Sequence, residues 1–315
     1  MSLDAGRARP ADVATDLREI MITHLGELCA LATALVWAFS VILFKKSGES
    51  VHPIALNTFK STLAMLLLVP TLYLWGDSLF HAAPARDYAL LFLSGAVGIA
   101  VADSLFFKSL NLLGAGLSAI VDCLYSPFII LLSVTFLSER LGWVQVVGVL
   151  MIISAVLTAT GVRGRGTVPR GDLVWGMIWG ALAMALMAIA IVMVKPILDR
   201  SPLLWATEIR LMGGCLVLYA QLLLRKRKDP ILRSLLMARS WKVTVLGSFL
   251  GAYVAMVLWI AGMKYTQAST AAALNQTSNV FVFLFAALFL KEKITGPKLL
   301  AICAAVTGVL LVTFD

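Results

Sequence analysis

The chain has 315 residues, of which 60% are hydrophobic and only 14% are charged, and its net charge is +9 at pH 7. A soluble domain usually has about 25% charged residues, so this chain has too little polar surface to cover a water-soluble globule of its size. The Lys and Arg residues lie mostly between apolar runs, which argues against nucleic acid as a partner and for the lipid bilayer.

Residues 1–24 are predicted to form a polar tail, because they mix acidic and basic residues and contain no apolar core of a signal peptide. A helix that spans a membrane needs roughly 20 apolar residues. Ten later runs reach about that length: 26–45, 53–75, 87–108, 113–137, 141–161, 172–196, 202–224, 242–264, 267–290 and 296–313. They are too long for strands and lack period-two alternation. The sequence therefore predicts an all-α, multi-pass integral membrane protein with ten transmembrane helices.

Two connectors are more basic than the others. Residues 162–171 read VRGRGTVPRG, which predicts a flexible basic linker. Residues 225–242 combine many basic residues with a few apolar ones, and both an interfacial helix and a solvated loop fit this pattern. The linker separates residues 25–161 from residues 172–315, and each part contains five of the predicted helices.

The two parts contain an internal repeat. Residues 91–140 align without gaps onto residues 244–293, an offset of 153, and twelve positions are identical. Both aligned segments end in similar sequences, FLSER and FLKEK, at the same joint between two helices. Because five is odd, the second five-helix copy must cross the membrane in the opposite sense. We therefore expect two inverted repeats with a substrate site between them near the bilayer midplane, an arrangement typical of secondary transporters.

Several features together indicate a family. The halves have matching lengths, and a basic residue follows a proline in the second and seventh helices, as Pro53 with Lys60 and Pro202 with Arg210. The segments LNLLGAGLSAIVDCLYSPF and MKYTQASTAAALNQTSNVF occupy equivalent places in the two halves. On these residues the chain resembles the EamA-like branch of the drug/metabolite transporter superfamily over roughly 25–313. The resemblance implies export or exchange of small molecules such as amino acids, metabolites or drugs. It also implies a bacterial cytoplasmic (inner) membrane, with both termini in the cytoplasm.

The basic residues favour the other orientation. The linker and the 225–242 segment lie on the side opposite the termini and hold most of the loop cations. The positive-inside rule places such loops in the cytoplasm. Both termini are thus expected on one side of the membrane, and the two arguments leave open which side it is.

Charged residues inside apolar runs are the first candidates for a site, because each costs roughly 2.5–3.5 kcal/mol at the centre of a spanning helix. Asp103 and Asp122 are expected at similar depths, where they could bind a cationic group or a coupling proton. The alternative is that each pairs with a cation such as Lys60 to hold helices together. Lys60 itself fits either an Asp partner or a substrate carboxylate. Glu208 and Arg210 lie near a helix start, where anchoring at the membrane surface is the favoured interpretation.

The repeat adds three polar residues to Asp122. Asp122 is equivalent to Asn275 and Ser126 to Asn279, and each half has its pair at spacing i, i+4, which is one helix face. We expect these polar strips on opposite walls of one cavity. The alternative is that they form hydrogen bonds between helices.

Aromatic residues complete the predicted substrate site, with Trp37 and Tyr253 as its candidates. No zinc-protease, hydrolase or nucleotide-binding motif occurs, and the three histidines are scattered, so we expect no catalytic residues, no metal and no cofactor. The predicted function is a secondary transporter of small metabolites, with alternating access around a midplane cavity, and not an enzyme. Two alternatives remain open, a lipid flippase and a membrane-embedded enzyme acting on lipid-linked substrates. Proton coupling and a homodimer also remain open.

Overall fold

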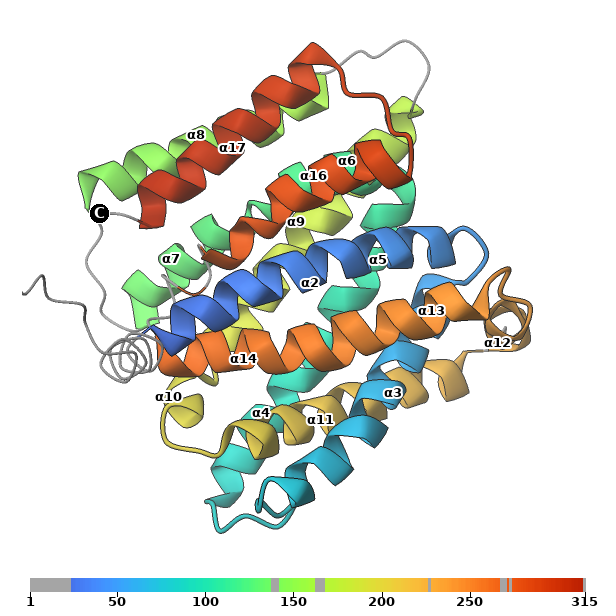
Figure 1. Ribbon diagram of the computed structural model, residues 1–315, viewed down its shortest axis with the longest axis vertical. Coiled ribbons are helices and arrows are strands. Elements are labelled where there is room, and N and C mark those ends of the chain that lie inside the picture. Colours follow the sequence, from blue (N-terminus) through green and yellow to red (C-terminus); the bar gives the residue numbers. More distant parts are fainter. Residues whose placement is uncertain are drawn as a thin grey trace, which may run out of the picture.

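The computed structural model describes residues 24–136, 142–161, 168–225, 228–266, 271 and 274–313. Throughout these residues the regular secondary structure is helical. Some of the long helices lie side by side with roughly aligned axes, such as α2 (Leu25–Gly48) and α14 (Ala255–Tyr265) (Figure 1). The predicted tail, apart from residue 24, and most of the predicted linker lie outside the described residues.

The described helices confirm the all-helical class. Seven are long and apolar enough to cross a membrane: Leu25–Gly48, Pro53–Leu74, Ala85–Leu113, Ala115–Phe136, Arg170–Val192, Leu203–Leu224 and Trp241–Tyr265. Shorter apolar helices occupy the other three predicted runs: Trp143–Thr158, Leu274–Phe289 and Gly296–Leu311.

The first half contains five of these apolar helices, some of them subdivided. Its elements are α2 (Leu25–Gly48), α3 (Pro53–Leu74), α4 (Ala85–Gly95), η1 (Ala96–Ala102), α5 (Asp103–Leu113), α6 (Ala115–Asp122), α7 (Tyr125–Phe136) and α8 (Trp143–Gly161). Helix α3 begins at Pro53, whose fixed φ suits a first helical position, and the His52 ring accepts a hydrogen bond from the Ile54 amide at 3.2 Å. Gly114 ends α5 with φ +81°, a conformation that favours glycine.

The second half repeats this order with two short additions. Its elements are α9 (Arg170–Val192), α10 (Lys195–Leu198), α11 (Leu203–Leu224), α12 (Lys228–Leu236), α13 (Trp241–Ser248), η2 (Phe249–Val254), α14 (Ala255–Tyr265), α16 (Ser278–Phe289) and α17 (Gly296–Thr313). The basic segment 225–242 contains a helix, α12, which buries Ile231 and leaves Leu236 73% exposed. Its Ser234 hydroxyl accepts a hydrogen bond from the His52 amide at 2.9 Å, so α12 is attached beside the start of α3.

A π-helical turn interrupts the third long helix of each half. The turn η1 begins at Ala96 and η2 begins at Phe249, which is the repeat offset of 153 residues. A π turn leaves carbonyl groups without their usual partners. In η1 the Asn57 side chain of α3 meets this need, donating a hydrogen bond to the Ile99 carbonyl at 2.7 Å and to Ser104 Oγ at 2.9 Å. The two interruptions are therefore a shared feature of the repeat.

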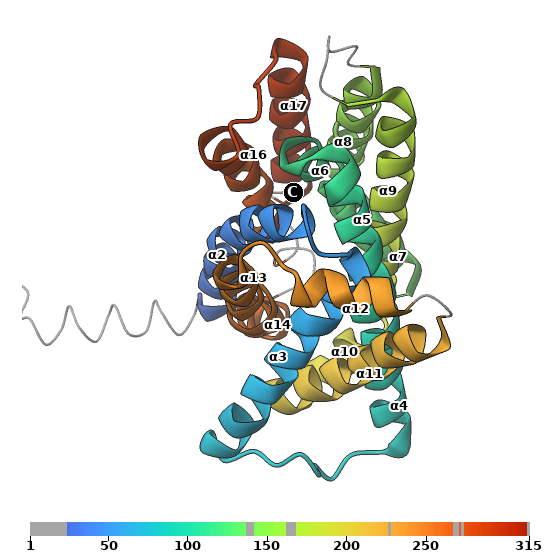
Figure 2. The same cartoon turned by 90° about the vertical axis from the view of Figure 1, so that its right-hand side faces the viewer.

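Helices α8 and α17 form a pair along one edge of the molecule (Figures 1 and 2). The pair packs closely at its glycines, because a Cβ on Gly308 would lie 2.6 Å from the Gly148 carbonyl oxygen. The remaining long helices of both halves surround the cavity described below.

The repeated FLSER and FLKEK endings have a structural explanation in the second half. Glu292, from FLKEK, accepts hydrogen bonds from the Ala115 amide at 2.8 Å and the Gly116 amide at 3.0 Å. Its carboxylate thus caps the start of α6 in the other half, where free N–H groups favour negative charge. The equivalent Glu139 lies outside the described residues.

Candidate functional site

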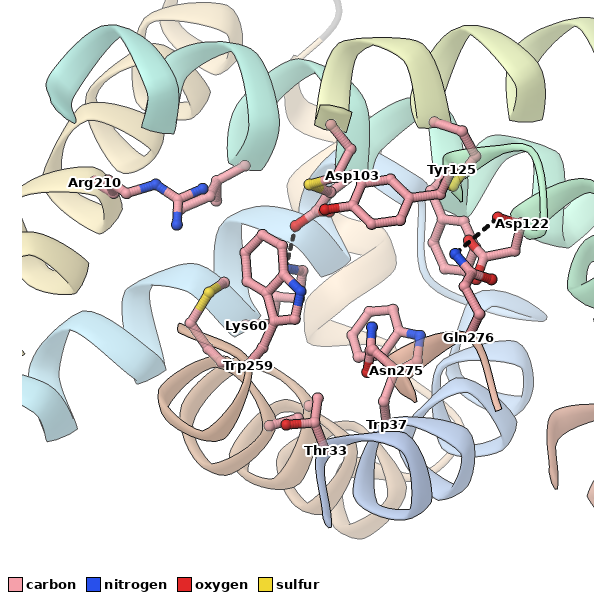
Figure 3. Close-up of a pocket in the computed structure, with 17 residues that line it drawn as sticks. Thr33, Trp37, Lys60, Asp103, Asp122, Tyr125, Arg210, Trp259, Asn275 and Gln276 are labelled. Carbon is pink, nitrogen blue, oxygen red and sulfur yellow. Dashed lines mark hydrogen bonds and ion pairs between the residues drawn. The ribbon is translucent and has the colours of Figure 1, made fainter. Parts of the chain in front are cut away.

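A cavity of about 100 Å³ lies between the two halves. Its lining comes from α2, α3, η1, α5, α6 and α7 in the first half and from α9, α11, η2, α14 and residues 275–276 in the second. Residues at repeat-equivalent positions of the two halves line it, for example Phe106 with Trp259. Asp122 and Asn275 are another such pair (Figure 3). A volume of this size holds several water molecules, at roughly 10–15 Å³ for each, and suits a small polar molecule.

Lys60 and Asp103 form an ion pair at the cavity wall. Lys60 lies two turns into α3, and its Nζ donates to Asp103 Oδ2 at 2.6 Å. Asp103 is the first residue after the π turn η1, and both side chains are buried. Of the alternatives that the sequence left open, the structure has Lys60 paired with an aspartate, while both residues also line the cavity.

Arg210 also lines the cavity, although its sequence position favoured an anchor at the membrane surface. Helix α11 begins at Leu203, so Arg210 lies two turns inside it and is 1% exposed. Its Nε donates to Ser94 Oγ at 3.0 Å, and its guanidinium carbon lies 5.5 Å from the centre of the Trp259 ring. Neither Nη1 nor Nη2 has a hydrogen-bond partner among the described residues. The structure thus places an incompletely paired guanidinium group at the cavity.

Glu208, two residues earlier, has a different position. It is fully buried, it does not line the cavity, and neither of its carboxylate oxygens has a hydrogen-bond partner within the described part of the chain.

Asp122 lies at the opposite side of the cavity from Arg210 (Figure 3). Asn275 and Gln276 also line the cavity, and the Gln276 amide donates to the Asp122 backbone carbonyl at 3.3 Å. Asn275 Oδ1 is buried without a hydrogen-bond partner in the described chain.

The second pair of the predicted polar strips does not line the cavity. Ser126 is buried, and its hydroxyl has no hydrogen-bond partner among the residues described. Asn279 donates to Cys123 Sγ at 3.3 Å and to Gln276 Oε1. The physical reason is a break in the helix: α6 ends at Asp122 and α7 begins at Tyr125, so the two positions do not share one continuous helix face.

The aromatic candidates divide in the same way. Trp37 lines the cavity and packs against Phe106, with ring centres 6.0 Å apart. Tyr253 lies elsewhere, with its hydroxyl hydrogen-bonded to Thr71 at 2.6 Å. Tyr125 and Trp259, which were not among the predicted site residues, also line the cavity. Methionines from α9 and α14 supply much of the remaining apolar wall.

Comparison with known proteins identifies the family. The model of the EamA-like transporter family matches twice, over residues 24–161 and residues 174–314. The chain belongs to the EamA-like transporter family. The two matches fall on the two predicted halves and confirm the duplication.

The EamA-like chain has relatives over most of its length. It is 24% identical over 284 residues to an uncharacterized transporter of Archaeoglobus fulgidus, which covers 90% of this chain and 96% of the relative. It is 25% identical over 132 residues to the uncharacterized transporter YetK of Bacillus subtilis, covering 42% of this chain and 39% of YetK. A solved crystal structure shares the fold, with a TM-score of 0.67 at 20% identity over 91% of this chain and 96% of that one. These matches agree with the predicted family and with a multi-pass membrane protein.

Proposed function

We propose that this chain is a secondary transporter that moves small metabolites across a bacterial inner membrane. In this proposal ten helices span the membrane as two inverted five-helix repeats, and access to the cavity alternates between the two sides. The observation that carries it is that repeat-equivalent residues of both halves line one cavity, as Asp122 and Asn275 do. Inverted-repeat transporters bind their substrates between the repeats and expose the site to each side by moving one repeat against the other.

The cavity lining supports a small, partly polar substrate. Two Trp rings and several methionines offer apolar contact, and charged groups are concentrated at a few points. This is the usual composition of a small-molecule site. A buried aspartate also provides a group that could carry a coupling proton. Lipid flipping and chemistry on lipid-linked substrates remain the alternative outcomes.

Flux measurements on the purified chain in proteoliposomes test the proposal. We expect uptake of at least one compound from a panel of amino acids, organic acids, amines and nucleosides, with a response to an imposed pH gradient if a proton is coupled. Asp122→Asn should reduce the rate by about tenfold or more, as expected for loss of a charge-assisted contact. Asp229→Asn, on an exposed surface, is the matched control. Movement of fluorescent lipids without flux of any panel compound would favour the flippase instead.

A further inference from the structure

The four charged side chains of the cavity fall into two classes. Lys60 and Asp103 neutralise each other at 2.6 Å. Arg210 and Asp122 have opposite charges, and neither forms an ion pair within the described residues. They lie on opposite sides of the cavity, with the Lys60–Asp103 pair between them (Figure 3). The unpaired charges therefore form the two ends of a dipolar site whose net charge is zero.

Arg210 presents its end of the site as a fixed fork. Ser94 Oγ accepts from Nε and itself donates to the Ala190 carbonyl at 2.6 Å, so a hydrogen-bonded chain fixes the orientation of the guanidinium group. The Trp259 ring packs against the group. Nη1 and Nη2 remain buried without partners among the described residues. An unpaired buried charge is costly, and the planar fork of arginine matches the two oxygens of a carboxylate. A carboxylate from the substrate would satisfy both nitrogens.

The Asp122 end presents acceptors. A carboxylate only accepts hydrogen bonds when it is ionised. Asn275 Oδ1, which belongs to the same cavity lining, is another acceptor and has no partner in the described chain. The Gln276 amide group, whose N–H donors would repel a cation, donates to the Asp122 backbone carbonyl. An ammonium group brings three donors and a positive charge, which suits this set of acceptors.

We propose that the cavity recognises an elongated zwitterion, with a carboxylate bound by Arg210 and an ammonium group bound by Asp122 at the other end. This rests on the proposed transport function and names its substrate class. The two charged groups of the substrate are separated by several bonds, because the Lys60–Asp103 pair lies between their binding points. The apolar chain between them contacts Trp37 and Trp259.

Two series of small-molecule probes test the proposal, and each series varies one property. We would measure binding to the purified full chain in lipid nanodiscs by isothermal titration calorimetry. One series varies the charge separation: alanine, 4-aminobutanoate and 6-aminohexanoate. A second series removes one charge from the longest probe: hexanoate and hexylamine. We expect 6-aminohexanoate to bind at least about tenfold more tightly than alanine, hexanoate or hexylamine.

Two variants assign the ends. Arg210→Gln should bring the affinity for 6-aminohexanoate down to that for hexylamine, and Asp122→Asn should bring it down to that for hexanoate. Arg170→Gln and Asp229→Asn, which alter exposed residues, should leave all affinities within about twofold. If Arg210→Gln does not fold, the wild-type probe series still decides, since it needs no variant.

Several outcomes would overturn the inference. They are equal binding of the zwitterion and the singly charged probes, tighter binding of alanine than of 6-aminohexanoate, or no binding of any probe at millimolar concentration. Parallel flux measurements separate this result from the function. Transport of singly charged compounds alone would refute the zwitterion and leave a transporter. Binding of 6-aminohexanoate without flux of any compound would keep the site and refute transport.

Discussion

Lys60 and Asp103 depend on each other, because each would otherwise be a buried charge in an apolar surrounding. Their separation is 2.6 Å, and the two side chains are 2% and 7% exposed. A buried pair need not add stability relative to apolar residues, but removal of one partner leaves an uncompensated charge.

Lys60→Met and Asp103→Leu should each destabilise the protein by about 3–5 kcal/mol, while the double variant should recover most of that loss. The recovery follows because the double variant buries no charge. Thermal or denaturant unfolding in detergent, arranged as a double-mutant cycle, measures the coupling between the two positions. Additive losses would show that the pair does not act as a unit.

Charge and hydropathy alone singled out Lys60, Asp103 and Asp122, which all line the cavity, since an ionisable residue inside an apolar run stands out in any sequence. Arg210 was less predictable. Its distance from the predicted helix start suggested an anchor, whereas its burial results from Ser94 and Trp259, which come from helices distant in the sequence. Partners of this kind depend on tertiary packing, and no local pattern reveals them.

The π turns are the distinctive elements of the molecule. They occupy equivalent positions in both halves, next to the cavity-lining residues Asp103 and Met256. An apolar run has the same composition whether it is α- or π-helical, so the sequence predicted one continuous helix in each place. The polar strips show the same limit: the break between Asp122 and Tyr125 separates positions that a continuous helix would align.

Asn57→Leu should destabilise the protein by about 1–3 kcal/mol, because the buried Ile99 carbonyl loses its side-chain donor. The loss of stability should appear first in the π turn η1. Hydrogen exchange followed by mass spectrometry should show that the substitution speeds exchange in residues 96–104 relative to the unaltered chain. It should leave the equivalent residues 249–257 unchanged, because they have no such donor among the described hydrogen bonds. Unchanged exchange in residues 96–104 would show that Asn57 does not support the π turn.

The close contact between α4 and α11 leads to a second prediction about helix packing. A Cβ on Gly95 would lie 1.7 Å from the Arg210 carbonyl oxygen, so Gly95→Ala must push the two helices apart. We expect a loss of at least about 1–3 kcal/mol, as in other overpacked sites, together with weaker ligand binding because Arg210 moves. Gly171→Ala is the matched control, since nothing lies within 4 Å of its Cβ position. Equal thermal stability of the two variants would refute this account of the packing.

At the scale of the whole molecule, the sequence predicted the duplication well, because the ungapped alignment preserves positions that both halves need. The matched endings FLSER and FLKEK are an example, since Glu292 caps a helix of the other half. The cavity between the halves was predicted only in outline. Five of the eight predicted site residues line it. Of the other three, Ser126 follows the helix break at residues 123–124 and Tyr253 lies in the π turn η2.

The distribution of basic residues predicts the orientation of the molecule in the membrane. If the spans alternate as proposed, the linker, α12 and the start of α13 lie on the side opposite the termini, and α12 is attached there through Ser234 and His52. That side holds the cations Arg170, Arg225, Lys228, Arg233, Arg239 and Lys242. The described loops and helix ends on the side of the termini hold fewer, Arg86, Lys195, Arg200 and Lys264.

The positive-inside rule predicts that the side with more cations faces the cytoplasm and that both termini face outward, opposite to the orientation that the family resemblance implies. A C-terminal alkaline phosphatase fusion, expressed in a bacterium, should therefore be active, and a C-terminal green fluorescent protein fusion should be dark. Replacement of Arg225, Arg233, Arg239 and Lys242 by Gln should weaken or reverse this orientation, because cations near the helix ends keep short loops on the cytoplasmic side. A fluorescent C-terminal fusion on the unaltered chain would show that the charge count does not determine the topology of this protein.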